Sequence, residues 1–146
     1  MDENTLLHKI IDIIQYKNEY QLQTSGIPPQ EMYVLERIYL HSNILSKDIS
    51  NKYKIPPSTL TGILDRLENK KLIERLRTNK DRRSIELNTT ENGKSAVEKH
   101  ITEDQIFARN LFNCLGPQKK EHLKALLEEM LGNIELISLF SPKHHQ

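Results

Sequence analysis

Apolar residues recur every three or four positions along most of the chain, the spacing that gathers side chains on one face of an amphipathic helix. In the N-terminal segment, residues 4–24, this face is formed by Leu6, Leu7, Ile10, Ile11, Ile14 and Tyr20. A second helix is predicted to begin at Pro28 and Pro29, because proline is tolerated at a helix start. Its apolar stripe is Met32, Leu35, Ile38 and Tyr39.

The centre of the chain predicts two helices joined by a tight turn. Residues 45–53 fit about two helical turns, with Ser46 as the predicted N-cap. A second helix is predicted from Pro57 to about Lys70, with its inner face at Leu60, Ile63, Leu64 and Leu67. The residues left to face outward are Ser58, Thr59, Thr61, Gly62, Asp65 and Arg66. A short helix, a tight turn and an exposed polar helix start are typical of a helix-turn-helix.

Two extended segments follow, at residues 73–78 and 83–88, and the charged turn between them has a basic tip. A hairpin in this position is typical of a wing. A long helix is predicted from about Thr90 to the break at Gly116-Pro117. The final helix has the most regular apolar spacing, at Leu123, Leu126, Leu127, Met130, Leu131, Ile134 and Ile137. The predicted fold is therefore mainly α-helical with a small β-hairpin wing, in which the terminal helices need a partner surface.

Composition limits the class of protein further. The chain has 146 residues, of which 36% are hydrophobic, with five Gly, six Pro and no Trp, and this favours one helix-rich domain over an all-β sandwich. No apolar run of about 18 residues and no signal-peptide pattern is present. Cys114 is the single cysteine, so no disulfide can form within the chain. We expect a cytoplasmic protein without a membrane segment.

Charge is distributed unevenly along the sequence. Residues 45–94 contain 12 Lys and Arg against 7 Asp and Glu, whereas the rest of the chain contains 9 against 13. The basic centre coincides with the predicted helix-turn-helix and wing. Nucleic acid is one partner that such a centre attracts.

The residue types at these positions suit DNA recognition. Ser58, Thr59 and Thr61 lie at the start of the predicted recognition helix, where short hydroxyl side chains and first-turn N–H groups can reach base edges and phosphates. Arg82 and Arg83 at the hairpin tip can enter a narrow minor groove, and Asp81 could hold one of them. Each signal alone also fits an ordinary solvated surface, but the two in this order support one geometry.

The sequence resembles the MarR family of winged helix-turn-helix transcriptional regulators, and the resemblance covers about a third of the chain closely. The motifs that carry it are Leu45-Ser46-x-x-x-Ile49, Pro57-Ser58-Thr59-Leu60-Thr61, Leu64-Asp65-Arg66-Leu67-Glu68, Ile73-Glu74-Arg75, Asp81-Arg82-Arg83 and Thr90-Glu91-Asn92-Gly93. The resemblance implies one domain over residues 1–146, with the winged helix-turn-helix at about 30–90 and dimerisation helices at 1–27 and 91–146.

The resemblance also implies roles for single residues. Ser58, Thr59, Thr61 and Arg66 would face the major groove and its phosphates, and Arg83 would enter the minor groove. Arg75 and Asp81 would brace the wing. Such regulators are typically homodimers that bind double-stranded DNA at a pseudo-palindrome, and repression is the favoured mode of action.

The chain departs from the family pattern at four positions. Lys54 and Lys71 stand where the family commonly has Gly, and Thr89 stands where a Leu is usual. A non-Gly residue in a left-handed conformation would cost about 1–2 kcal/mol. Pro56 replaces the hydroxyl residue that could cap the recognition helix.

Candidates for sensing are weaker. Cys114 is expected to be a small buried apolar residue rather than an oxidation sensor. The six histidines lack His-x-x-x-His spacing, and His41 beside Glu36 or His100 beside Glu103 could converge only through folding, so no metal site and no cofactor is predicted. A small-molecule effector remains open, in a cleft between the dimerisation helices and the DNA-binding part. Aromatic candidates for its wall are Tyr16, Tyr20, Tyr33, Tyr39, Phe107 and Phe112.

Two other functions compete with DNA binding. An enzyme would need a nucleophile with its base, paired carboxylates or a phosphate loop, and none is visible in the sequence. A winged-helix module that binds another protein without specific DNA binding is the main alternative. It predicts a neutral or apolar outer face, which the hydroxyl residues and arginines oppose.

Overall fold

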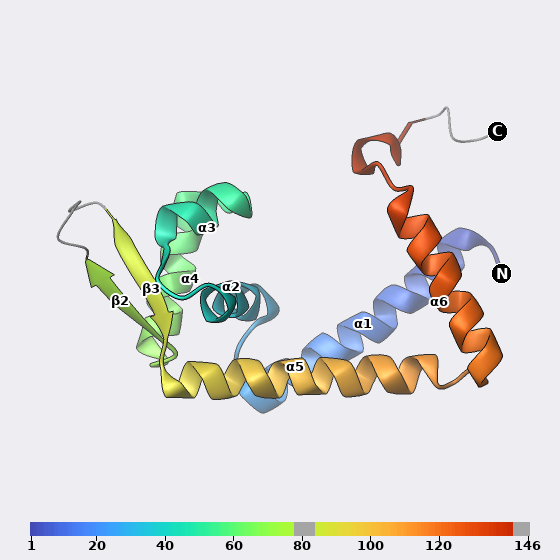
Figure 1. Cartoon of the computed structure of the whole chain (residues 1–146), viewed down its shortest axis with the longest axis horizontal. Helices are drawn as coiled ribbons and strands as arrows, with labels where there is room; N and C mark the ends of the chain where they lie inside the picture. The colour runs from blue at the N-terminus through green and yellow to red at the C-terminus, as the bar shows by residue number, and fades with distance from the viewer. Residues whose placement is uncertain (78–83, 142–146) are drawn as a thin grey trace. The chain divides into compact units, whose positions relative to one another are not determined.

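The computed structural model describes residues 1–77 and 84–141, and their fold is mainly helical with a small sheet (Figure 1). The helices are α1 (Glu3–Ser25), α2 (Pro29–Leu40), α3 (Ser46–Lys52), α4 (Pro57–Asn69), α5 (Glu91–Phe112) and α6 (Pro117–Gly132), followed by a 3-10 turn at Leu136–Ser138. The strands are β1 (Ile44–Leu45), β2 (Ile73–Arg77) and β3 (Ile85–Thr89). The predicted winged helix-turn-helix fold class is confirmed.

The chain divides into two compact units, Met1–Asp104 and Gln105–Gln146, with the boundary inside α5. In the first unit, α2, α3 and α4 lie together with the sheet at the N-terminal end of α5 (Figure 1). The domain boundaries implied by the family resemblance stay a prediction. Within the described ranges, no helix combines the length and the apolar character that crossing a membrane requires.

The hydrophobic core lies in the helix-turn-helix and the sheet. Its buried residues are Ile27, Met32, Val34, Leu35, Ile38, Ile49, Leu60, Ile63, Leu64, Leu67, Leu72, Ile73, Leu87 and Val97. All four residues predicted for the inner face of α4 are among them. Because burial of each such side chain contributes about 1.5–3 kcal/mol, this cluster fixes how α4 is presented at the surface.

The sheet has three antiparallel strands in the order β1-β3-β2. The predicted hairpin is present, with Ile73 paired to Thr89 and Arg77 paired to Ile85. The third strand, β1, was not predicted, because two residues are too few to show a period. It pairs Ile44 with Leu87 and so ties the start of α3 to the wing.

Three local predictions need correction. Ser46 is the first residue of α3 and not its N-cap, because Leu45 holds the cap position in extended conformation. The last helix ends at Gly132, so Ile134 and Ile137 lie beyond it. Cys114 is exposed and not buried, because α5 has already ended at Phe112 and the thiol lies in the turn before α6.

The positions where the family has glycine adopt the backbone conformation that glycine favours. Lys54 has φ 53° and Lys71 has φ 59°, both in the left-handed region. At Lys71 the strained turn is held by Thr90, whose hydroxyl donates to the Lys71 carbonyl at 2.7 Å and accepts from the Gly93 N–H at 3.0 Å. This one side chain caps α5 and joins it to the end of α4.

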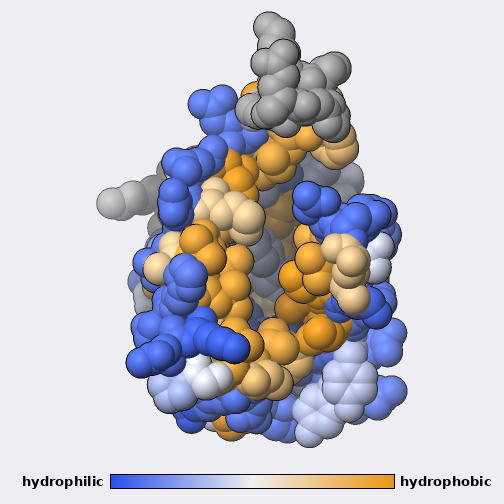
Figure 2. All heavy atoms as spheres, turned by 90° about the vertical axis from the view of Figure 1, so that its right-hand side faces the viewer, coloured by the Kyte–Doolittle hydropathy of each residue, from blue (hydrophilic) through white to orange (hydrophobic). Residues whose placement is uncertain are grey.

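Both terminal helices expose apolar side chains on their own surfaces (Figure 2). Along α1 these include Leu6, Leu7, Ile10, Ile11, Ile13, Ile14 and Leu22, and the one buried residue of this helix is Gln21. Along α6 they include Leu123, Leu126, Met130 and Leu131, and no residue of this helix is buried. Each helix therefore carries an exposed apolar face.

Candidate nucleic-acid interface

The outward face of α4 is short and polar at its start. Ser58, Thr59 and Thr61 are exposed, while Leu60 and Ile63 between them are buried, so the core fixes which side chains point outward. The Thr61 hydroxyl donates to the Pro57 carbonyl at 2.9 Å. Its proton is therefore used within the helix, whereas its oxygen can still accept a hydrogen bond and its methyl group can contact a base.

The N-terminus of α4 carries no side-chain cap, as the Pro at position 56 predicted. Pro56 occupies the N-cap position and Pro57 the first helical position, and neither side chain can accept a hydrogen bond. The backbone N–H groups of the first turn thus point out of the helix beside Ser58 and Thr59. Uncapped N–H groups and the positive end of the helix dipole together suit a phosphate.

Arg66, predicted to face the groove, is half exposed and also pairs with Glu31 at the start of α2. Its Nε lies 3.4 Å from Glu31 Oε2, and 53% of its side chain is exposed. Glu31 is 5% exposed in its side chain and also pairs with Lys70 at 3.0 Å. Two cations therefore balance the buried carboxylate, and the exposed half of Arg66 remains available to a phosphate.

The wing is attached to α4 through Arg75, the predicted wing support. Arg75 on β2 pairs with two carboxylates of α4: its NH2 lies 2.5 Å from Asp65 Oδ1, and its Nε lies 3.3 Å from Glu68 Oε2. Only 21% of the Arg75 side chain is exposed. One guanidinium facing two carboxylates fixes the direction in which the hairpin leaves the recognition helix. Asp81, Arg82 and Arg83, the other wing residues predicted, lie outside the described residues.

An aromatic and cationic stack between α2 and α3 was missed by the sequence reasoning. The Arg37 guanidinium lies 4.0 Å from the ring centre of Tyr33 and 5.3 Å from that of Tyr53, and the two rings meet edge to face at 6.0 Å. The stack holds the C-terminal end of α3 on α2. Its sequence signal was the Tyr33-x-x-x-Arg37 spacing, one helical turn, although the partner on α3 could not be foreseen.

The first unit also contains a cavity of about 390 Å³ among the end of α1, the start of α2, the end of α4 and the middle of α5. It is lined by Gln21, Ser25, Gly26, Ile27, Met32, Lys70, Leu72, Ala96, Lys99, His100 and Glu103. None of the six aromatic candidates lines this cavity among the described residues. Tyr33 instead packs against Arg37, and Tyr39 donates a hydrogen bond to Glu98 at 3.2 Å.

Comparison with known proteins agrees with this geometry. Residues 27–85 match the sequence profile of the MarR family. The HTH-type transcriptional repressor MdtR of Bacillus subtilis is 31% identical over 106 residues, which are 72% of this chain and 68% of that protein. The uncharacterized HTH-type transcriptional regulator YwhA of the same organism is 29% identical over 137 residues, 89% of this chain and 99% of that protein.

Solved structures show the same fold. A mutant form of MepR from S. aureus superposes with a TM-score of 0.83 at 24% identity and covers 92% of this chain and 100% of that chain. MepR in a complex with DNA superposes with a TM-score of 0.70 at 24% identity, over 92% of this chain and 99% of that one. The relatives are transcriptional regulators, which confirms the prediction that the chain is not an enzyme.

Proposed function

The chain belongs to the MarR family, and on this premise we propose that it is a transcriptional regulator that binds double-stranded DNA through α4 and the wing. The observation that carries the proposal is the outward face of α4. Four buried residues fix this face, Ser58 and Thr59 stand at its uncapped start, and Arg75 ties the wing to its flank.

Each part of this surface has a distinct role in the proposal. Ser58, Thr59 and Thr61 read base edges in the major groove, and the first-turn N–H groups bind a phosphate. Arg66 contacts the backbone with its exposed half. Arg82 and Arg83 enter the minor groove beside it, where a narrow A·T-rich groove attracts arginine.

The regulator acts as a homodimer in this proposal. The apolar faces of α1 and α6 support it, because a monomer would leave them in water at a cost that burial between two copies removes. A two-fold dimer that places its α4 helices about 34 Å apart reads two half-sites one DNA turn apart. The operator is then a pseudo-palindrome, and binding blocks access to a promoter. MdtR, named as a repressor, supports repression over activation.

The cavity in the first unit supports release by a small effector. Its volume of about 390 Å³ lies in the range of about 300–1,000 Å³ that is common for small-molecule sites. Its walls combine apolar Ile27, Met32 and Leu72 with polar Lys99 and Glu103, which suits an amphipathic molecule. A bound molecule would contact α2 and α5 together, and α2 packs against α4.

Selection of random duplex DNA by the purified chain, at about 50 and about 200 mM salt, tests the function. The proposal predicts an enriched pseudo-palindrome with half-sites about 10 base pairs apart that is still bound at the higher salt. Binding that disappears with salt and enriches no sequence would refute specific recognition. Absence of binding at both salts would favour the protein-interaction module instead.

Sedimentation of the chain tests the dimer separately. We expect the wild type to sediment as a dimer and Ile10→Glu, a charge on the exposed face of α1, to shift it toward monomer. Gln23→Glu on the same helix is the matched control, since position 23 lies outside the apolar stripe. A wild-type monomer would refute the proposed dimer but would leave the proposal of DNA recognition by α4 untested by this experiment.

A further inference from the structure

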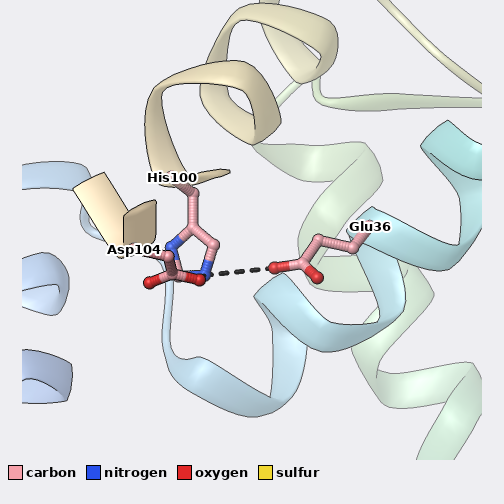
Figure 3. A group of neighbouring side chains, drawn as sticks. All are labelled: Glu36, His100 and Asp104. Carbon is pink, nitrogen blue, oxygen red and sulfur yellow. Dashed lines mark ion pairs between the residues drawn. The ribbon is translucent and has the colours of Figure 1, made fainter. Parts of the chain in front are cut away.

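The structure brings together three metal-ligating side chains that the sequence keeps far apart. Glu36 on α2 and His100 and Asp104 on α5 lie side by side, and one ligand atom of each lies within 4.8 Å of the other two (Figure 3). His100 Nε2 is 3.1 Å from Glu36 Oε1 and 3.3 Å from Asp104 Oδ2. We propose that Glu36, His100 and Asp104 form a binding site for a divalent first-row transition metal of the Zn²⁺ class.

The two distances from His100 match the spacing of ligand atoms around a metal ion. Ligand atoms at about 2.0–2.1 Å from a tetrahedral zinc ion lie about 3.3 Å apart, close to the two distances observed. A neutral imidazole that carries its proton on Nε2 has one proton there for two carboxylate oxygens, so it can satisfy them only by sharing it. An ion between the three side chains would instead bind one atom of each.

The surrounding side chains orient the two carboxylates as an outer shell does. Lys17 Nζ and Gln21 Nε2 donate to Asp104 Oδ1 at 2.6 and 3.1 Å, which leaves Oδ2 turned toward His100. Arg37 NH1 lies 3.4 Å from Glu36 Oε2, which leaves Oε1 turned toward the same histidine. Outer-shell partners that fix one oxygen and free the other are a regular feature of metal sites.

Charge and ligand type set the class and strength of the ion. One imidazole nitrogen with two carboxylate oxygens suits Zn²⁺, Fe²⁺ or Mn²⁺, whereas Ca²⁺ and Mg²⁺ take oxygen ligands alone. Lys17 and Arg37 already balance the two carboxylates, so binding is expected to be weaker than at closed four-ligand zinc sites. Three protein ligands also leave a fourth position open for water.

The site lies within the first compact unit and does not depend on the proposed function. His100 and Asp104 are one turn apart on α5, and Glu36 belongs to α2, which packs against α4. The ion would therefore fasten α2 to α5. Metal binding measured without DNA can therefore succeed or fail independently of any regulator role.

Competition for Zn²⁺ against a chromophoric chelator tests the site on the full chain. His144→Ala/His145→Ala serves as the background, because adjacent histidines can bind zinc by themselves. We expect one zinc per chain, with affinity lowered at least 10-fold by His100→Gln and by Asp104→Asn. Glu91→Gln, an exposed carboxylate at the start of α5, is the matched control and should change affinity less than twofold. Mg²⁺ should not compete.

Two further measurements guard against misfolding and chance binding. Melting without metal shows which variants fold, and Glu36→Gln replaces any ligand variant that does not. Co²⁺ should give visible absorption bands of low coordination number in the parent and lose them in Glu36→Gln. Zinc binding that all ligand variants retain, or no binding by the parent at 100-fold excess zinc, would overturn the proposal.

Discussion

Gly93 lies where α5 begins against the turn that leads into β2, and a side chain has no room there. A Cβ built on Gly93 would lie 2.0 Å from the Leu72 carbonyl oxygen, 3.0 Å from its carbon and 3.3 Å from the Thr89 Cβ. The Leu72 oxygen accepts a hydrogen bond from the Thr90 N–H at 3.1 Å, so it cannot turn away without losing that bond. Gly93→Ala therefore forces α5 and this turn apart by roughly 1 Å.

The cost follows from these contacts. Overpacking against backbone lies at the upper end of the usual range of about 1–3 kcal/mol, and a weakened Thr90 hydrogen bond adds about 1 kcal/mol. Alanine offsets about 1 kcal/mol through its better helix propensity. The expected loss in the free energy of unfolding is about 3 kcal/mol, which lowers the melting temperature by roughly 10 °C.

Urea unfolding followed by circular dichroism measures this loss. Gly132→Ala, at the end of α6, is the matched control because a Cβ there meets nothing within 4 Å. The control should be as stable as the wild type or up to about 1 kcal/mol more stable. If Gly93→Ala unfolds at the same urea concentration as the wild type, the close approach of α5 to Leu72 is not a constraint on this fold.

Three smaller changes test other contacts. Lys71→Gly relieves the strain of a left-handed backbone at a non-glycine residue. After the entropic cost of glycine is subtracted, the free energy of unfolding measured in urea should rise by about 0.5–1 kcal/mol, and a fall would contradict the strain. Arg75→Met breaks two ion pairs to half-exposed carboxylates and should lower the free energy of unfolding by at most about 1 kcal/mol. The free energy of binding to the selected duplex should fall by more than this, and unchanged binding would contradict the role of Arg75 as wing support. Hydrogen bonding from Thr5, first by its side chain and then by its backbone N–H, lowers the pKa of the Asp2 carboxyl below its ordinary 3.8. The capping by Asp2 is therefore present above that pH and is lost as the pH falls through the lowered value. The difference in melting temperature between the wild type and Asp2→Ala should therefore shrink toward low pH, and a constant difference would contradict this.

Helical periodicity predicted most of the fold. In α4, four apolar residues at spacings of three and four had to face the core, and all four are buried, so the outward face followed directly. The strand β1 could not be predicted, because two residues show no period and their pairing with β3 depends on the tertiary fold. Cys114 was predicted to be buried from a stripe that includes Leu111 and Phe112, but the helix ends before it.

The candidate interface was predictable to the extent that it lies on one helix. Ser58, Thr59 and Thr61 are neighbours in sequence and share a face, whereas the partners of Arg66 and Arg75 are set by packing between elements. The group of Glu36, His100 and Asp104 was only partly visible in the sequence. His100-x-x-x-Asp104 is one helical turn, but only folding brings Glu36 to it.

The central claim is that the start of α4 reads bases, and Thr59→Ala tests it most directly. Affinities of the wild type and the variant are measured for the duplex recovered by selection and for a scrambled duplex of equal length. Base recognition by α4 predicts a loss of roughly 5- to 150-fold on the selected duplex and no change on the scrambled one, because a good base contact contributes about 1–3 kcal/mol. Thr102→Ala, an exposed threonine on α5, should change neither. Equal weakening on both duplexes, or no weakening on either, would contradict base recognition by this face.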